Sequence, residues 1–141
     1  MNILVFDLGG TSVKYAIWDG GLKYKNKFKT PNSWDKMQLE MLKLKKIFSK
    51  EYKIEGVALS APGTVNEKER MIQGISAIPY IHNFSIYDDL EKVFQLPVTI
   101  ENDANCAALA ECWKGSAQNV ENVILLVIGS GIGGSIIINR K

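Results

Sequence analysis

Three short segments of the sequence combine residue types that can bind a phosphate group or move a proton. The first reads DLGGT at residues 7–11, with Lys14 shortly beyond it. Glycines lack a Cβ atom and let backbone N–H groups approach an anion, Thr11 adds a hydroxyl donor, and Asp7 can hold a hydrated Mg²⁺ ion. This segment therefore predicts a phosphate-binding turn. The alternative is that the glycines only make a hairpin turn and Asp7 only a local hydrogen bond.

The second segment reads ENDAN at residues 101–105 and falls where a strand is expected to meet the start of a helix. A carboxylate directed out of such a junction can accept a proton from a hydroxyl group while that oxygen attacks a phosphorus atom. Asp103 is therefore the candidate general base. The alternative is that Asp103 or Asn102 serves only as the N-cap of the helix.

The third segment reads GSGIGG at residues 129–134, between two apolar runs. Glycine is costly in such a place unless the backbone takes a positive φ angle or approaches another group closely. A second phosphate-binding loop explains this composition, whereas a tight hairpin with a bulge does not easily explain Gly133 and Gly134 together. The three segments follow the order that a two-lobed phosphotransferase requires: a phosphate turn, a base and a second phosphate loop.

The elements around these segments predict a sheet that is covered by helices. Apolar runs and alternation predict strands at residues 3–6, 13–18, 22–29, 57–59, 98–100, 123–128 and 132–138. Helices with one apolar face are expected after Ser33, after Ser85 and from Asn102 or Asp103. The stretch that follows Pro62 and Gly63, as far as Asn83, is expected to be rich in turns. The lysines of the third strand are expected to protect an exposed sheet edge, and the whole is a mixed α/β arrangement.

The bulk composition indicates that the partner is a small molecule. The chain has 141 residues and a formal net charge of +2, which is too balanced to indicate a nucleic-acid or membrane-surface protein. Its longest apolar run, Val123–Ile128, is far shorter than the roughly 20 residues of a membrane helix, and Asp7 interrupts any signal-peptide core. We therefore expect a cytoplasmic protein with no nucleic-acid or membrane partner. Cys106 and Cys112 are expected to be reduced thiols.

At these motifs the sequence resembles the ROK family (repressor, open reading frame, kinase) of actin-like and hexokinase-like ATPases. The resemblance covers nearly the whole chain. It is carried by DLGGTSVK at residues 7–14, SAPG at residues 60–63, LPVTIENDANCAALAE at residues 96–111 and IGSGIGGSIII at residues 128–138. It implies a ribonuclease-H-like lobe at residues 1–118, with a mixed sheet flanked by helices, and the first hairpin of an incomplete C-terminal lobe at residues 119–141.

The resemblance also implies an activity and the residues that carry it. The activity is an ATP-dependent sugar kinase, which transfers the γ-phosphate of Mg²⁺–ATP to a hexose or hexose derivative, usually at the 6-hydroxyl. The first phosphate segment is then Asp7, Gly9, Gly10, Thr11 and Lys14, with Asp7 holding Mg²⁺ through water, and the second is Gly129, Ser130, Gly131 and Gly133. Sugar binding falls to Gly63, Asn83, Asn102 and Asp103, with Asp103 as the catalytic base.

Several features of the family are expected to be missing from this chain. The family's second lobe brings a sugar-binding glutamate and histidine, a Cys-rich structural zinc site and the adenine pocket, so the isolated chain is expected to be inactive. Because the sequence starts directly with a strand, no DNA-binding segment is expected before it, and this expectation disfavours a repressor. His82 is expected to be a structural or pocket-rim residue.

Two alternative functions stay open at this point. One is a sugar-sensing regulator that does not transfer phosphate, and the other is a short chain that acts only as a binding or assembly module. The identity of the sugar does not follow from the motifs, since small changes in hydroxyl partners decide it. A homodimer of the complete protein is compatible with the sequence.

Overall fold

The computed structural model describes residues 1–128 and 132–140. Contacts between residues divide the chain into two compact units, residues 1–100 (unit 1) and residues 101–141 (unit 2). Among the described residues, no helix is long and apolar enough to cross a membrane.

Unit 1 is built on a five-stranded mixed sheet with the strand order β3-β2-β1-β4-β7. The strands are β1 (Asn2–Leu8), β2 (Ser12–Trp18), β3 (Leu22–Lys29), β4 (Ile54–Ala61) and β7 (Val98–Asn102), the last of which runs into unit 2. Strand β1 pairs antiparallel with β2 and parallel with β4, and β2 pairs antiparallel with β3. The expected mixed α/β sheet is therefore confirmed.

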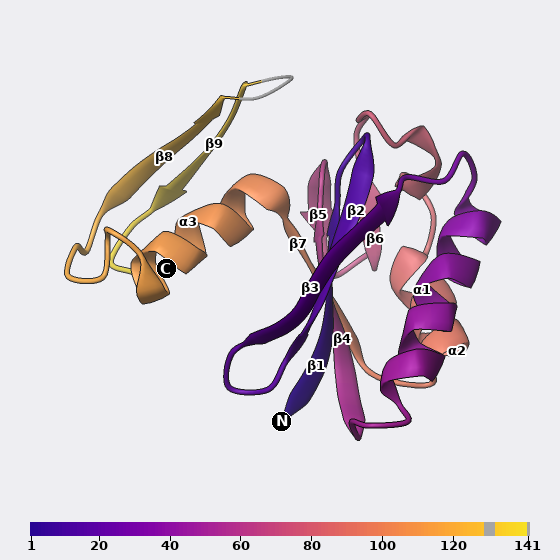
Figure 1. Ribbon diagram of the computed structural model, residues 1–141. Coiled ribbons are helices and arrows are strands. Elements are labelled where there is room, and N and C mark those ends of the chain that lie inside the picture. The colour runs from indigo at the N-terminus through magenta and orange to yellow at the C-terminus, as the bar shows by residue number, and fades with distance from the viewer. Residues whose placement is uncertain (129–131, 141) are drawn as a thin grey trace. The chain divides into compact units, whose positions relative to one another are not determined.

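The two faces of the central strand β1 lie in different environments. Leu4, Phe6 and Leu8 are at most 2% exposed, while the residues between them are only partly buried. The buried face packs against helices α1 (Trp34–Phe48) and α2 (Ile86–Phe94), which lie side by side (Figure 1). Since successive strand residues point to opposite faces, Asp7 lies on the face that these helices do not cover.

Strand β3 forms one edge of the sheet, as its lysines predicted. Its residues are exposed, except that Phe28 is partly buried. Tyr24 has a φ of 54°, and the pairing of β2 with β3 shifts between Tyr15 and Ile17. The regular alternation expected along this strand is therefore interrupted near Tyr24.

The stretch expected to be rich in turns also contains three short elements that the sequence analysis did not predict. Strands β5 (Thr64–Asn66) and β6 (Met71–Gln73) form a hairpin, and a 3₁₀ helix η1 (Pro79–Ile81) follows. Ile72, Ile78 and Ile81 of this stretch are fully buried. Its packing against the core, rather than any local pattern, makes these short strands stable.

Arg70, in the β5–β6 turn, ties this hairpin to helix α2. It has a φ of 56° and forms ion pairs with Asp88 and Glu91. The hydrogen bond to Asp88 raises the pKa of the Arg70 guanidinium. The guanidinium also lies over the ring of Tyr87, at 5.2 Å from its centroid.

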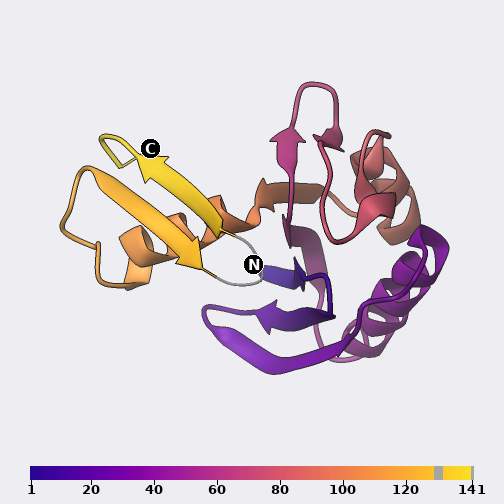
Figure 2. The ribbon, with the colours of Figure 1, turned by 90° about the horizontal axis from the view of Figure 1, so that it is seen from above.

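Unit 2 consists of helix α3 (Asp103–Lys114) and the hairpin of β8 (Val123–Ile128) and β9 (Ile132–Ile137). The hairpin lies over the helix, as Figure 2 shows. The contact face is formed by Ala108, Cys112, Ala117 and Ile137, all buried, with Val123 and Leu125 packed against them. Neither Cys106 nor Cys112 forms a disulfide within the described residues.

The other face of this hairpin is apolar and exposed. Its large side chains are 67–83% exposed, and they are Ile124, Leu126, Ile128, Ile132 and Ile136. A soluble protein rarely leaves such a row of aliphatic side chains uncovered. Helix α3 groups with the hairpin in unit 2, whereas the lobe boundary expected after residue 118 concerns the complete protein and stays a prediction.

We expect the replacement of a buried methionine in helix α1 to cost far more stability than that of an exposed leucine in the same helix. Met41 is 0% exposed, and Met41→Ala should lower the free energy of unfolding by about 2–5 kcal/mol because it leaves a cavity. Leu39 is 56% exposed, and Leu39→Ala should change it by no more than about 0.5 kcal/mol. Urea denaturation of the 141-residue chain measures both. Equal losses would contradict the packing of α1.

Candidate active site

Asp7 lies at the level where three neighbouring strands carry polar side chains. The pairing register places Lys14 of β2 on one side of it and Ser60 of β4 on the other. Lys14 Nζ lies 3.1 Å from Asp7 Oδ2, and the Ser60 hydroxyl donates to Asp7 Oδ1 at 3.0 Å. The side chains of Lys14 and Asp7 are 68% and 44% exposed, so this ion pair contributes little to stability. Its effect is to orient the carboxylate.

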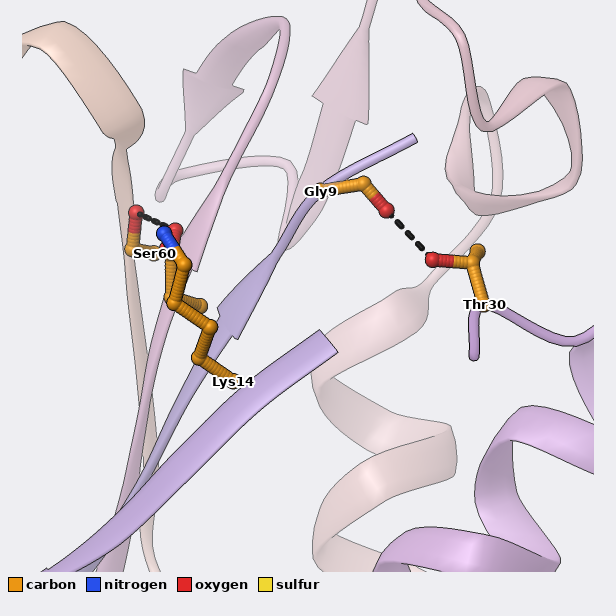
Figure 3. A network of polar contacts seen from close by, with 5 residues as sticks. Gly9, Lys14, Thr30 and Ser60 are labelled. Atoms are coloured by element: carbon orange, nitrogen blue, oxygen red, sulfur yellow. Dashed lines mark hydrogen bonds and ion pairs between the residues drawn. The ribbon is translucent and has the colours of Figure 1, made fainter. Parts of the chain in front are cut away.

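The turn after β1 is held by hydrogen bonds within itself and from Thr30, which directly follows strand β3. The Gly9 N–H donates to the Ser12 carbonyl at 3.2 Å. The Thr30 hydroxyl donates to the Gly9 carbonyl at 2.6 Å, and the Thr30 N–H donates to the Thr11 carbonyl at 3.1 Å. Figure 3 shows the Thr30 hydroxyl facing the Gly9 carbonyl. Both carbonyls are therefore occupied, and the exposed backbone of Gly10 and Thr11 is the part of the turn that can meet a ligand.

The two glycines of this turn are required by close approach. A Cβ atom on Gly9 would lie 2.7 Å from the Ser12 carbonyl oxygen, and one on Gly10 would lie 2.7 Å from the Ala77 Cβ. Real Cβ atoms do not come so close to either group. The turn thus offers a narrow exposed backbone with a lysine and a carboxylate nearby, which fits a phosphate group and a hydrated Mg²⁺ ion. No cluster of three or more metal-binding side chains occurs in the described part of the chain.

Gly63 and Asn83, two candidate sugar-binding residues, both contact Ile72 of strand β6. Gly63 has a φ of 111°, and a Cβ atom there would lie 2.7 Å from His82 Cε1 and 2.7 Å from Ile72 Cγ2. Asn83 has a φ of 62° and is exposed, and its N–H donates to the Ile72 carbonyl at 2.8 Å. The strand β6 residue Ile72 therefore contacts both of these positions.

His82 itself is a buried side chain of unit 1. It is 9% exposed, and its Nε2 lies 2.7 Å from the Ser76 hydroxyl. Its Nδ1 has no hydrogen-bond partner among the described residues. The ring is thus held by Ser76 and by its packing against Gly63, in agreement with the structural role expected for it.

Asn102 and Asp103 lie at the junction of β7 and α3, where a strand end meets a helix start. The Asn102 side chain accepts hydrogen bonds from the N–H groups of Ala104 at 3.0 Å and Asn105 at 3.1 Å, so Asn102 is the N-cap. Asp103 is exposed, and its Oδ1 also accepts from the Ala104 N–H, at 2.9 Å. The capping role that both residues could have taken falls mainly to Asn102, and the Asp103 carboxylate stays accessible at the helix start.

The third candidate segment, GSGIGG, is described only in part, because Gly129, Ser130 and Gly131 lie outside the described residues. Gly133 and Gly134 lie in β9, which pairs with β8 without any shift in register and therefore without a bulge. Neither takes a positive φ angle. A Cβ atom on Gly134 would lie 3.2 Å from the Leu125 carbonyl oxygen, and one on Gly133 would lie 3.7 Å from the Ala104 Cβ. The approach to the Leu125 carbonyl is therefore tight at Gly134, whereas a Cβ atom on Gly133 would make an ordinary van der Waals contact.

Sequence reasoning missed several polar residues that hold the candidate groups in place. Thr30 and Ser76 are the partners of the glycine turn and of His82, and Ser135 of β9 donates to Asn105 in helix α3. Ser60 was noted only as part of a motif. The pairing of β1 with β4 places it opposite Asp7, which a register argument could have found.

Comparison with known proteins decides the family. The profile of the ROK family matches residues 3–141. The chain belongs to the ROK family.

Several relatives of this ROK chain are named as sugar kinases. A beta-glucoside kinase of Listeria monocytogenes is 39% identical over 142 aligned positions, which cover 100% of the chain and 48% of the relative. A ROK family protein from Streptococcus pneumoniae in complex with sucrose has a TM-score of 0.85 and 40% identity, and 100% of the chain covers 47% of that structure. A ROK family glucokinase from Streptomyces griseus, in complex with glucose and AMPPNP, has a TM-score of 0.87 and 30% identity, with coverages of 100% and 46%.

These likenesses confirm the expected fold class: the mixed sheet with its helices belongs to the actin-like ATPase fold of the ROK kinases. The chain spans about half the length of the curated relatives that it matches. The activity of the complete protein and the roles of the candidate residues are therefore proposed below.

We expect Gly63→Ala to destabilise the chain more than Gly74→Ala. Both glycines have a positive φ, 111° and 97°, so alanine is strained at either position, by about 1–3 kcal/mol. Only at Gly63 would the new Cβ also meet His82 and Ile72, whereas at Gly74 nothing lies within 4 Å of it. Overpacking should add about 1–3 kcal/mol to the loss at Gly63. Thermal or urea unfolding of both variants measures this difference, and losses of the same size would refute the close packing of Gly63 on His82.

Proposed function

We propose that the complete protein is an ATP-dependent kinase of a hexose or hexose derivative and phosphorylates the sugar at its 6-hydroxyl. The observation that carries the proposal is the division of roles at the start of α3. Asn102 caps the helix, so the exposed carboxylate of Asp103 is available as a base. The names of the relatives, which are kinases of β-glucosides, glucose and N-acetyl-D-glucosamine, support a sugar as the acceptor.

In this mechanism Asp103 accepts the proton of the sugar hydroxyl as its oxygen forms a bond to the γ-phosphorus, and the bond from that phosphorus to the leaving ADP oxygen breaks. Bound Mg²⁺–ATP supplies the phosphoryl group and part of the charge neutralisation. Lys14 and the backbone of Gly10 and Thr11 would bind phosphate oxygens, and Asp7 would hold the metal ion through water. Gly129, Ser130, Gly131 and Gly133 are assigned to the second phosphate segment, and of these only Gly133 belongs to the described residues.

Sugar binding is assigned to four residues in the proposal: Gly63, Asn83, Asn102 and Asp103. Amide and carboxylate side chains suit the hydroxyl groups of a sugar, because an amide both donates and accepts hydrogen bonds and a carboxylate accepts them. Hydroxyl recognition of this kind separates hexoses that differ at one carbon. The particular hexose is therefore left to a panel of sugars and glycosides.

The proposal also requires polypeptide beyond residue 141. The relatives are about twice as long as this chain, and the exposed apolar face of the β8–β9 hairpin suits a covering by such a segment. We assign the adenine pocket, a structural zinc site and any homodimer contacts to that second lobe. The lobe boundary stays at residue 118 in this proposal. We assign the reaction to the cytoplasm.

Asp103→Asn should lower turnover by about 10²–10⁴-fold in the full-length gene product, because the amide cannot accept the proton. Binding of the sugar should change little, since the two side chains have the same shape. The measurement is ADP release with Mg²⁺–ATP and a panel of hexoses and glycosides, together with calorimetric sugar binding.

The matched control is Asp35→Asn, which changes the acidic residue in the first turn of α1 and should leave turnover unchanged. Wild-type turnover in Asp103→Asn would remove Asp103 as the base. Sugar binding by the wild-type protein without any ADP release would instead favour a non-catalytic sugar sensor.

A further inference from the structure

A chain of hydrogen bonds within unit 2 joins strand β9 to the start of helix α3. The Ser135 hydroxyl donates to Asn105 Oδ1 at 2.7 Å. The Asn105 side-chain NH₂ donates to Glu101 Oε1 at 3.1 Å, and the same oxygen accepts the Asn102 N–H at 2.7 Å. The chain thus runs from one strand of the hairpin, through a side-chain amide, to the backbone of the N-cap residue.

Each member of this chain fixes the orientation of the next. An asparagine side chain can turn over, exchanging its donor and acceptor ends. Here the Glu101 carboxylate accepts only, so it holds the NH₂ end of Asn105, and the carbonyl end must then face Ser135. Ser135 is 7% exposed, so its hydroxyl is withdrawn from water and depends on this acceptor. The partly buried Asn105 is therefore held from both sides.

The position of this chain relates it to two of the proposed functional segments. Glu101 and Asn105 flank Asp103, and Asn105 also donates its backbone N–H to the N-cap Asn102. Ser135 lies in β9, the strand that contains the last residues of the GSGIGG segment. Gly133 in the same strand runs so close to helix α3 that a Cβ atom on it would contact the Ala104 Cβ at 3.7 Å. The strand and the helix start are thus joined by packing and by a hydrogen-bonded bridge.

We propose that Ser135, Asn105 and Glu101 are positioning residues, which hold the base Asp103 in a fixed relation to the strand that continues from the second phosphate segment. The inference rests on the proposed function, because it takes Asp103 as the base and that segment as a phosphate loop. In this arrangement a shift of β9 is transmitted to the helix start. The base is aligned only while the hairpin is in place.

The structural part of this inference is tested on the 141-residue chain by amide hydrogen exchange, measured by NMR. Ser135→Ala removes the hydroxyl that holds Asn105, so the backbone amides of Ala104 and Asn105 should exchange about tenfold faster. The matched control is Ser116→Ala, which removes another serine hydroxyl bonded to a side chain of α3, that of Glu111. It should leave those two amides unchanged. Unchanged exchange in Ser135→Ala would overturn the positioning role.

The catalytic part is tested on the full-length gene product. A small displacement of a catalytic group can cost about 100-fold in rate, so Ser135→Ala should lower kcat about 10- to 100-fold, with little change in the KM for the sugar. Ser135→Thr keeps the hydroxyl and should restore most of kcat, whereas Ser116→Ala should have no effect.

The failure of this inference is distinguishable from the failure of the proposed function. If the wild-type protein releases ADP and Ser135→Ala has the same kcat, the inference alone is wrong. A loss in Ser135→Ala that Ser135→Thr does not restore would also overturn it, since the hydroxyl would then not be responsible. If the wild-type protein releases no ADP with any sugar, the proposed function fails and the catalytic role of the three residues fails with it.

Discussion

The two-sided environment of strand β1 is the constraint on which the rest of unit 1 depends. Its side chains at Leu4, Phe6 and Leu8 are sealed under α1 and α2, and this leaves Asp7 on the uncovered face between Lys14 and Ser60. A shift of one residue in register would send the carboxylate into the core and the leucines to the surface. Burial of an unpaired carboxylate costs several kcal/mol, so the hydrophobic core and the placement of Asp7 are fixed together.

Close backbone approach is the second constraint, and it acts at both candidate sites of unit 1. Gly10 lies against Ala77 and Gly63 lies against His82, in each case too close for a side chain. Ala77 and His82 flank the 3₁₀ helix η1, so this one stretch supports both the glycine turn and the sugar-binding candidate Gly63. The segment that looks least regular in the sequence therefore shapes the surfaces to which the functional residues belong.

The two faces of the β8–β9 hairpin in unit 2 have different environments. Its inner face is stabilised by small residues such as Ala108 and by the bridge from Ser135, while its outer face is a row of exposed aliphatic side chains. The relatives have about twice this length. A hairpin that is apolar on the outside and tied to the proposed base on the inside is well suited to connect a second lobe to the chemistry.

The sequence by itself determined the elements whose patterns are local. Strands β1, β2 and β8, helices α1 to α3 and the glycine turn were predicted at nearly their observed positions. The reason is that the periodicity of apolar residues, which predicts these elements, is a pattern of residues close together in the sequence. The family was also recognisable from its motifs. Only the tertiary structure decided the β5–β6 hairpin, the bridge between Ser60 and Asp7 and the bridge between Ser135 and Asn105. These depend on strand pairing and packing between residues up to 53 positions apart, and no local pattern specifies such contacts.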